Sequence, residues 1–281
     1  MKLGIMQGRL VPPEAGRFQC FPRRRWREEF ASAAAARLDT IEWIYDAYGE
    51  DVNPIATDEG AVEMQRLSMA HGVGIESVCA DWFMDYPLLG ADPNTLQHRW
   101  SRLAWLMKRC GAMNIKRIVI PFVDASAIRG AEDAATVAAG ILSLGELIVL
   151  TKVELHLETA LAPTDFAGLL AQIPHPGVRV NYDAGNSASL GYLPREEFGA
   201  YGGRVGSVHL KDRKLGAGTV PLGEGNTDFD ALFDSLCAVG YGGDFILQVA
   251  RGAAGDEVAW ACQNAGIARQ MLRRLDVAHA G

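Results

Sequence analysis

Short segments of apolar and β-branched residues alternate with longer segments of helical periodicity along the whole chain. Before Cys110, for example, Trp100, Leu103, Leu106 and Met107 recur at the spacing of one helix face. The pattern predicts eight strands, at Lys2–Met6, Thr40–Ile44, Ile75–Phe83, Ile115–Pro121, Val153–Thr159, Val178–Asp183, Val205–Asp212 and Asp244–Val249. It predicts a helix after each strand, at Trp26–Arg37, Gly60–Ala70, Asn94–Cys110, Glu132–Leu150, Thr164–Ile173, Pro194–Tyr201, Asp228–Val239 and Asp256–Leu275.

Eight strand-then-helix units of roughly 35 residues each favour a parallel sheet with helical crossovers. A doubly wound dinucleotide-binding sheet would carry a G-x-G-x-x-G turn after its first strand, whereas the turn from Gln7 to Pro12 reads QGRLVP. Eight units within 281 residues instead favour a (β/α)8 TIM barrel. No low-complexity segment interrupts the alternation, so we expect a single domain over residues 1–281.

Composition and charge narrow the class of partner. Hydrophobic residues make up 49% and charged residues 22% of the chain, a mixture that excludes extensive disorder. A net charge of −7 without a basic stripe argues against a nucleic-acid partner. The 5 cysteines form no C-x-x-C pair, and no apolar run reaches membrane-spanning length. We expect a cytoplasmic protein that acts on a small molecule away from membranes; assembly into a homo-oligomer stays open.

Four consecutive predicted strands carry side chains that can bind a metal ion. Glu158, Asp183 and His209 lie near the ends of the fifth, sixth and seventh strands, and Gln248 lies in the eighth. In a barrel of this kind, the carboxyl ends of the strands carry the active site. Two carboxylates, an imidazole and an amide oxygen make a suitable site for one divalent ion, Mn²⁺, Mg²⁺, Co²⁺ or Zn²⁺.

Period-two alternation predicts which side chains point into the barrel. On the fifth strand Glu154, His156 and Glu158 share one face, and the apolar residues between them take the other. The seventh strand likewise directs His209 and Lys211 to one side. The apolar faces would pack on the outer helices, so we expect the polar sets to face inward.

The segments LHLETA, NYDAGN, VHLKDR and VPLGEGNTDFD, with the opening MQGRL and the second-strand IEWI, carry a family resemblance. Over nearly the whole chain they resemble the xylose-isomerase-like (AP endonuclease family 2 type) TIM-barrel superfamily of sugar phosphate isomerases and epimerases. The ketopentulose-phosphate 3-epimerases and hexulose-phosphate isomerase homologues are the most similar. The resemblance implies one divalent metal and proton transfer next to a sugar carbonyl. It places the family's metal ligands at Glu158, Asp183, His209 and the strand-eight position.

The strand-eight position departs from that family pattern. The epimerases carry glutamate there, as metal ligand and second acid/base, whereas this chain has Gln248. An amide oxygen can coordinate a hard cation but cannot shuttle protons near neutral pH. We therefore expect Glu158 to abstract the proton next to a metal-polarised carbonyl, with an enediolate as the intermediate. His156, Lys211 and a water held by the metal stay open as the second proton donor.

Further polar residues near the strand ends are candidates for substrate binding. They are Gln7, Arg9, Glu42, Asp81, Asn186, Lys211, Arg213 and Arg251. Gln7 and Arg9 leave the first strand and either hold a substrate anion or serve the protein surface. Glu42 and Asp81 either face substrate hydroxyl groups or are solvated acids at the loop edge.

The residues after the seventh strand have two interpretations. Lys211 and Arg213 lie beside a glycine-rich loop at 223–225 and a helix that begins near Asp228. Such a loop often binds phosphate in this fold. The alternative is an ordinary connection capped by Asp228. Arg251, just past the eighth strand, is a further candidate for anion binding.

Three functional classes fit these features. The leading hypothesis is a metal-dependent sugar or sugar-phosphate isomerase or epimerase. A lyase of the same superfamily, which dehydrates a keto-sugar or a cyclic keto-acid, is an alternative. A sugar-binding barrel that has lost its second acid/base is another. A DNA-repair endonuclease of this fold is disfavoured, since it needs more metal ligands and a basic groove.

Overall fold

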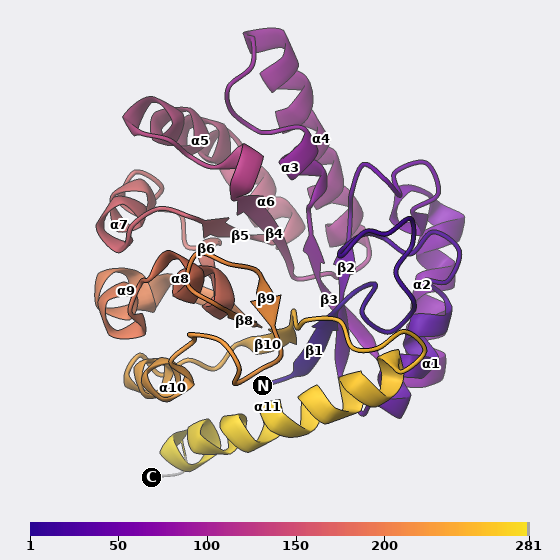
Figure 1. Cartoon of the computed structure of the whole chain (residues 1–281). Coiled ribbons are helices and arrows are strands. Elements are labelled where there is room, and N and C mark those ends of the chain that lie inside the picture. Colours follow the sequence, from indigo (N-terminus) through magenta and orange to yellow (C-terminus); the bar gives the residue numbers. More distant parts are fainter. Residues whose placement is uncertain (280–281) are drawn as a thin grey trace.

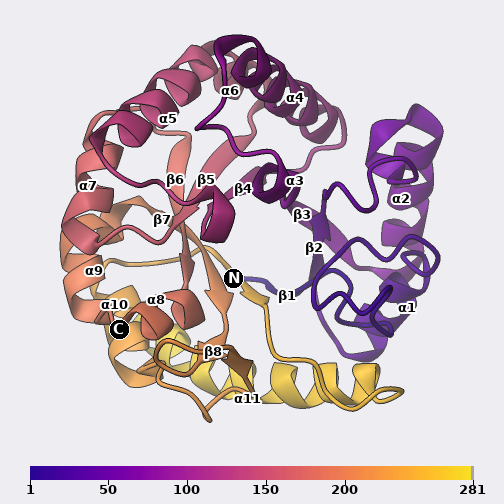
Figure 2. The same ribbon diagram turned by 45° about the horizontal axis from the view of Figure 1, so that its top comes forward.

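Eight parallel strands close into a barrel in the computed structural model, which describes residues 1–279 (Figures 1 and 2). The strands run around the barrel in the order β1, β10, β7, β6, β5, β4, β3, β2. Their bounds are β1 Leu3–Met6, β2 Thr40–Ile44, β3 Gly74–Cys79, β4 Arg117–Phe122, β5 Glu154–Thr159, β6 Val178–Asp183, β7 Val205–Leu210 and β10 Asp244–Leu247. The predicted (β/α)8 fold is confirmed.

Helices form a layer around the outside of the barrel (Figure 2). The α-helices are α1 Glu28–Ala35, α2 Asp58–His71, α3 Trp82–Asp85, α4 Pro93–Ala112, α5 Ala131–Ser143, α6 Gly145–Thr151, α7 Pro163–Ala171, α8 Ala184–Leu190, α9 Pro194–Tyr201, α10 Phe229–Ala238 and α11 Glu257–His279. Three short 3₁₀ helices are η1 Pro54–Ala56, η2 Asp124–Ser126 and η3 Gly202–Arg204. A two-stranded hairpin, β8 Asp212–Arg213 and β9 Thr219–Val220, follows β7.

Local sequence signals set several helix ends. The side chains of Thr57, Asp92 and Asp228 accept hydrogen bonds from backbone N–H groups in the first turns of α2, α4 and α10. Such caps satisfy donors that have no partner inside the helix. At the other end, α2 and α8 stop at Gly72 and Gly191, which have φ angles of 66° and 78°. Glycine adopts this left-handed conformation without steric cost.

Alternate residues of the strands face the helices and the barrel interior, as the period-two pattern predicts. Trp43 of β2 packs outward, with its ring centroid 5.7 Å from that of Trp26 and 6.2 Å from that of Phe30. Inside the barrel, His156 of β5 contacts Ser207 of β7 across the intervening strand β6. The interior of this barrel is therefore polar on the side of β5 to β7, where the candidate ligands lie.

The third and seventh predicted strands end earlier in the structure than the sequence pattern indicates. The third strand was expected to reach Phe83 but ends at Cys79, because the backbone N–H of Trp82 bonds to the carbonyl of Tyr45 and starts α3. The expected seventh strand ends at Leu210 rather than at Asp212. Asp212 instead pairs with the second strand of the small hairpin. In both cases the residues after the shortened strand, such as Asp81 and Arg213, line the cavity at the mouth of the barrel.

The predicted helix Glu132–Leu150 is divided into α5 and α6, with Leu144 as the residue between them. Among residues 1–279 no single helix is long and apolar enough to cross a membrane, although α5 and α6 taken together meet that test by length and composition. Val137, Ile141 and Ile148 of this pair are buried in the hydrophobic core. The bend lets the two segments follow the curvature of the barrel wall (Figure 2).

Candidate metal centre

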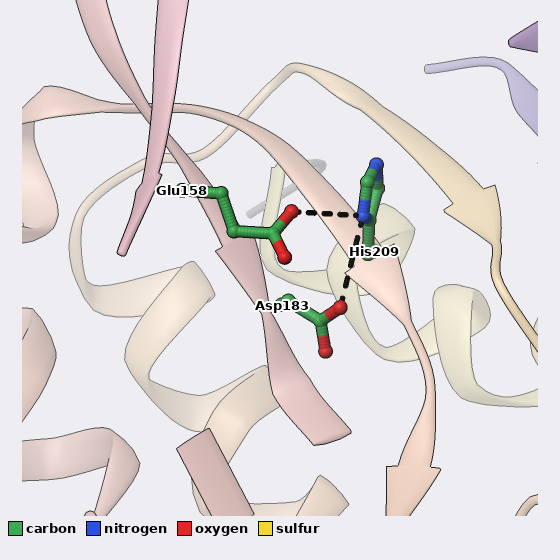
Figure 3. A group of neighbouring side chains, drawn as sticks. All are labelled: Glu158, Asp183 and His209. Atoms are coloured by element: carbon green, nitrogen blue, oxygen red, sulfur yellow. Dashed lines mark ion pairs between the residues drawn. The ribbon is translucent and has the colours of Figure 1, made fainter. Parts of the chain in front are cut away.

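Three strand ends bring a glutamate, an aspartate and a histidine together in the barrel (Figure 3). Asp183 of β6 lies opposite His209 in the register of β6 and β7, and Glu158 is near the end of the neighbouring β5. One potential ligand atom from each residue lies within 4.8 Å of the others, and all three residues are buried. The structure thus assembles three of the four predicted ligands, and these residues could hold a metal ion.

The ring of His209 is oriented by Glu42, from the other side of the barrel. The Oε1 atom of Glu42 lies 2.7 Å from Nε2 of His209, and both side chains are 0% exposed. A carboxylate accepts hydrogen bonds, so it fixes the proton on Nε2. The other ring nitrogen, Nδ1, is buried without a hydrogen-bond partner. It lies 3.4 Å from Oε2 of Glu158 and 3.8 Å from Oδ2 of Asp183.

A buried ring nitrogen that has no hydrogen-bond partner and faces two carboxylates fits a divalent cation. Metal-binding histidines commonly donate their second ring N–H to a carboxylate, and Glu42 supplies that carboxylate here. Imidazole and carboxylate donors suit Mn²⁺, Co²⁺ and Zn²⁺, and the carboxylates also suit Mg²⁺. Glu42, predicted as a substrate contact or a solvated acid, is instead a fully buried partner of a ligand.

Opposite charges are concentrated around this group. Burial opposes charge on His209, but Glu42, Asp183 and Glu158 outweigh it and raise the pKa of His209 well above its usual value. Burial also opposes charge on Asp183, yet Lys211 and His209 lower its pKa to about 2. The Nζ atom of Lys211 lies 3.2 Å from Oδ2 of Asp183. A negative site of this kind attracts a cation.

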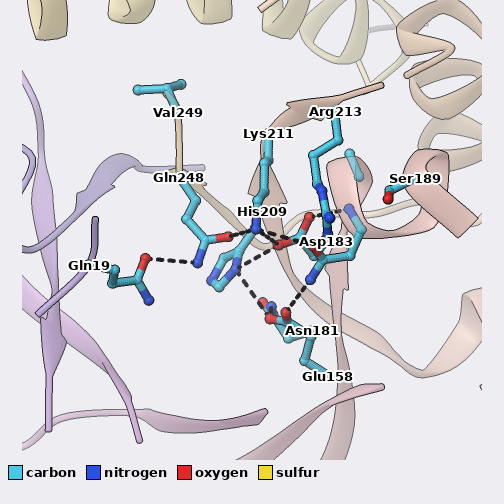
Figure 4. Close-up of polar contacts among 12 residues, drawn as sticks. Gln19, Glu158, Asn181, Asp183, Ser189, His209, Lys211, Arg213, Gln248 and Val249 are labelled. Carbon is cyan, nitrogen blue, oxygen red and sulfur yellow. Dashed lines mark hydrogen bonds and ion pairs between the residues drawn. The ribbon is translucent and has the colours of Figure 1, made fainter. Parts of the chain in front are cut away.

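Two asparagines hold the carboxylate of Glu158, and Figure 4 shows one of them, Asn181, beside it. The side-chain amide of Asn186 donates to Oε1, and that of Asn181 donates to Oε2, both at 2.8 Å. The hydroxyl of Ser207 in turn donates to the amide oxygen of Asn181 at 2.6 Å. Asn186 was predicted; Asn181 and Ser207 were not assigned a role. Their signal was available, since each lies two residues before a ligand, on the same strand face.

The structure does not bring His156 to the substrate side of Glu158. Its Nδ1 atom lies 2.7 Å from the hydroxyl oxygen of Ser207, and its Nε2 atom lies 2.9 Å from a carboxylate oxygen of Glu154. Burial lowers the pKa of His156, and Glu154 opposes that effect. Because β5 advances by one inward position between His156 and Glu158, the imidazole is one layer deeper in the barrel. Its geometry supports a structural role.

Gln248, the predicted ligand of the eighth strand, makes hydrogen bonds with both ends of its side-chain amide. It follows the last residue of β10, and its amide oxygen accepts a hydrogen bond from Nζ of Lys211 at 3.0 Å (Figure 4). Its amide nitrogen donates to the side-chain oxygen of Gln19 at 3.2 Å. Lys211 also donates to Asn186 at 3.2 Å. The ammonium group of Lys211 therefore lies between Gln248 and the ligand Asp183.

A cavity of about 410 Å³ opens beside the ligand group. Of the predicted site residues, it is lined by Glu158, Lys211, Gln248, Asp81, Asn186 and Arg213. The Nη1 atom of Arg213 donates to the amide oxygen of Asn186 at 2.9 Å, so the guanidinium is connected to the partner of Glu158. Further lining residues, which the sequence interpretation did not assign, include Arg17, Gln19, Asp46, Asp85 and Asp124.

Besides Glu42, three predicted substrate contacts lie outside this cavity. The side-chain oxygen of Gln7 accepts the backbone N–H of Ile44 at 2.9 Å, which ties β1 to β2. Arg9 is buried and donates to the backbone carbonyl of Val249 at 3.0 Å. Arg251 donates to the backbone carbonyl of Gly8 at 2.7 Å. These three side chains form hydrogen bonds with backbone groups and hold loops and strands together, so they are not directed into the cavity.

Asp81 lines the cavity and has a raised pKa. Burial raises its pKa to about 6, against hydrogen bonds from Gln19 and Cys79 and with a further contribution from Asp46. The Nε2 atom of Gln19 donates to Asp81 at 2.7 Å. Gln19 also accepts from Gln248, so it links Asp81 to the side of the cavity that carries Lys211.

A model of the xylose isomerase-like TIM barrel family matches residues 30–275 of this sequence. The chain belongs to that family. The L-ribulose-5-phosphate 3-epimerase UlaE of Shigella flexneri serotype 5b is 24% identical over 265 residues, which cover 84% of this chain and 87% of that protein. A putative L-ribulose-5-phosphate 3-epimerase UlaE of Shigella dysenteriae serotype 1 is 23% identical over 255 residues, with 83% and 85% covered.

Solved structures share the fold at lower identity. An L-ribulose 3-epimerase superimposes with a TM-score of 0.74 at 17% identity, over 99% of this chain and 96% of that one. The IOLI protein, solved with a bound zinc atom, gives a TM-score of 0.75 at 13% identity, over 99% of both chains. At these identities the match establishes the common barrel; the chemistry has to be argued from the residues of the site.

Proposed function

We propose that this protein is a divalent-metal-dependent isomerase or epimerase that moves a proton on the carbon next to a sugar carbonyl. The observation that carries the proposal is the Nδ1 atom of His209, which is buried, has no hydrogen-bond partner and is directed toward the carboxylates of Glu158 and Asp183. The cavity beside this group has the volume of a small-molecule site. The epimerase activity in the names of the relatives agrees with it.

Glu158, Asp183 and His209 would hold the metal ion, as the zinc atom of the IOLI structure suggests for this family. A bound divalent cation would supply Lewis-acid polarisation of the substrate carbonyl. The protein's part is to keep the three donor side chains close together and oriented. Glu42 holds the imidazole ring of His209 in place, and Lys211 lowers the pKa of Asp183.

Glu158 is the base in this proposal. Its carboxylate lines the cavity, and the amides of Asn181 and Asn186 hold both of its oxygens in one orientation. A positioned carboxylate can take the proton from the carbon next to the carbonyl. The two amides remain neutral and do not compete for that proton, so they orient the base without acting as acids.

Lys211 is the second proton donor in this proposal. Its ammonium lines the cavity, whereas His156 lies one layer deeper and is bonded to Ser207 and Glu154. A substrate hydroxyl or carbonyl oxygen would take the place of Gln248 on Nζ, while Asp183 continues to balance the charge. Because the glutamine amide cannot exchange protons near neutral pH, the two proton-transfer groups are a carboxylate and an ammonium.

Solvent exchange tests this function. The protein is loaded with Mn²⁺ and incubated in D₂O with ketopentoses, ketohexoses and their terminal phosphate esters, and the products are examined by mass spectrometry and NMR. We expect deuterium at the carbon next to the carbonyl and products of conserved composition. Glu158→Gln should lower the exchange rate by about 10²–10⁴-fold, the usual effect of losing a general base. Glu146→Gln, on an exposed position of α6, is the matched control.

Two outcomes would contradict the proposal. Loss of water from the substrate would assign the site to a lyase. Binding of a sugar without any exchange, in protein that contains its full complement of metal, would show that the protein binds sugars without catalysis. Glu158 would then not act as a base.

A further inference from the structure

The loop after β7 is the place where this fold often binds a phosphate group, and here an internal carboxylate occupies its N–H groups. The carboxylate of Asp212 accepts hydrogen bonds from the backbone N–H groups of Gly223, Gly225 and Thr227, at 2.9, 2.9 and 3.1 Å. The residue is 1% exposed. A Cβ atom at Gly225 would collide with this carboxylate, so glycine is needed for the loop to close on it.

The arginines beside the first and last strands are also engaged. The Nη1 atom of Arg9 and the Nε atom of Arg251 both donate to the carbonyl of Phe18, at 2.9 Å each. Both arginines line a separate cavity of about 70 Å³, and neither lines the large one. Arginine groups that hold backbone carbonyls in this way maintain loop structure and present no open fork to a phosphate.

Of the remaining cations that line the large cavity, Lys211 is paired with a carboxylate, Arg213 is bonded to neutral oxygens, and Arg17 lies at the rim. The three ammonium hydrogens of Lys211 have three acceptors in the protein, and one of these is the carboxylate of Asp183. Arg213 donates to the carbonyl of Ala217 and to Asn186. Arg17 is exposed at the rim, where its guanidinium lies 4.8 Å from the ring centroid of Tyr48.

The opposite part of the cavity is acidic. In the barrel order β2 and β3 lie across from β6 and β7, and the loops after β2, β3 and β4 contribute four aspartates to the lining. These are Asp46, Asp81, Asp85 and Asp124. Within residues 1–279, no hydrogen bond or ion pair is found for the carboxylates of Asp85 and Asp124, which are exposed at the cavity. Carboxylates accept hydrogen bonds from hydroxyl groups and repel phosphate.

From this charge distribution we infer that the substrate is an unphosphorylated polyhydroxy carbonyl compound. Its carbonyl end lies at Glu158 and Lys211, and its hydroxylated far end donates hydrogen bonds to the acidic side, with Asp85 and Asp124 as the acceptors that have no protein donor. A terminal phosphate at that end would meet carboxylates and would find the loop N–H groups bound to Asp212. The inference rests on the proposed isomerase or epimerase function and specifies its substrate class.

The test compares each free ketose with its own terminal phosphate ester on the Mn²⁺-loaded protein. Solvent exchange gives kcat/KM, and calorimetry gives the Kd independently of turnover. We expect the free ketose to be preferred by at least about tenfold in both measurements, and inorganic phosphate not to compete. A preference for the phosphate ester, or competition by inorganic phosphate, overturns the inference. If no sugar is exchanged the proposed function fails, and calorimetry still decides the substrate class, since an absence of free-ketose binding counts against it.

Two variants locate the cause of the preference. Asp85→Asn combined with Asp124→Asn removes two exposed negative charges. The ratio of kcat/KM for the free ketose to kcat/KM for its phosphate ester should then fall by about tenfold. Asp234→Asn, the same change on the outer side of α10, where Asp234 pairs with Arg274, should leave the ratio unchanged. An unchanged ratio in the double variant would show that the acidic side does not select the substrate.

Asp212→Ala addresses the loop directly. The three backbone N–H groups would lose their acceptor, and we expect inorganic phosphate to raise the Tm of this variant and not that of the wild-type protein. Asp212→Asn is the second variant, since it keeps the volume of the side chain and one acceptor oxygen. Stabilisation of the wild-type protein by phosphate would show that an anion site remains open and would contradict the inference.

Discussion

The two sides of the barrel mouth use the same kind of residue for different purposes. On the side of β5 to β7, Glu158 and Asp183 approach a histidine nitrogen that has no hydrogen-bond partner, and the group could hold a metal ion. On the side of β2 to β4, Asp46 accepts the backbone N–H groups of Phe21 and Gly49, at 2.9 and 2.7 Å, and supports a loop.

A carboxylate at the end of a barrel strand therefore has no fixed role. Glu42, in the middle of β2, lies deeper and positions the imidazole of His209. Asp81, one strand further, faces the cavity and bonds to Gln19. The partner that the neighbouring strand or loop supplies determines whether the acid binds a cation, orients a ligand, supports a loop or contacts substrate.

The largest effect is expected from the side that binds the cation. His209→Ala removes the donor between Glu158 and Asp183, and we expect the bound metal and the exchange activity to be lost. Elemental analysis after reconstitution with Mn²⁺ measures the metal directly. His98→Ala, which changes a histidine on the exposed side of α4, is the control. Full metal occupancy in His209→Ala would show that the site lies elsewhere.

Glu42→Gln tests how much the orientation of His209 contributes to metal binding, because Glu42 contacts the histidine and is not itself one of the proposed metal ligands. The amide oxygen can still accept the Nε2–H of His209, but the negative charge is lost, so metal affinity should fall by about 10–100-fold. Competition with a chelating dye measures the affinity. Glu76→Gln on β3, whose side chain pairs with Lys2, is the control with the same charge change. Equal affinities in the two variants would mean that Glu42 has a structural role only.

Ser207→Ala tests whether the buried hydrogen-bond chain positions the base. Without the hydroxyl donor, the amide of Asn181 is held less firmly against Glu158, and we expect kcat to fall by about tenfold with KM and metal content unchanged. Ser207→Thr keeps the hydroxyl and should recover part of kcat. A fall in stability without a change in kcat would contradict the positioning role; Ser235→Ala, at a buried serine of α10, gives the size of a purely structural effect.

The smallest effect is expected for stability on the acidic side. The pKa of Asp81 is raised to about 6 by burial. Between about pH 4 and pH 6 the unfolded chain loses this proton while the folded state keeps it, so stability falls as the pH rises through this window. Asp81→Asn removes the ionisation but weakens the hydrogen bond from Gln19 to a charged acceptor, so it should be more stable than the wild-type protein by about 1 kcal/mol at pH 7, less than the roughly 3 kcal/mol of the pKa shift alone, and equally stable below pH 4.

Asp46→Asn gives the contrasting result. Its two carboxylate oxygens accept separate backbone N–H groups, and an amide nitrogen cannot replace one of them, so this variant should lose about 1 kcal/mol at pH 7. Chemical denaturation of both variants over pH 4–8 measures the difference. Equal changes in the two variants would show that the roles of Asp46 and Asp81 are not distinct.

Local patterns in the sequence predict most of the fold and the centre of the site. The alternation of apolar runs predicts the barrel, and period two predicts that Glu158 and His209 face inward. These features depend on neighbours within a few residues. The ligand group follows, because the carboxyl ends of parallel strands meet at one end of the barrel.

Contacts between side chains of distant strands could not be predicted, because they leave no local pattern in the sequence. Glu42 and His209 are 167 residues apart and meet only because the barrel closes. Lys211 pairs with Gln248 and Asp183 for the same reason. Asp212, a strand residue by its local pattern, turns away and binds the loop N–H groups instead. Burial and the hydrogen-bond partners that each side chain finds across the barrel assign these roles, and both exist only after the chain has folded.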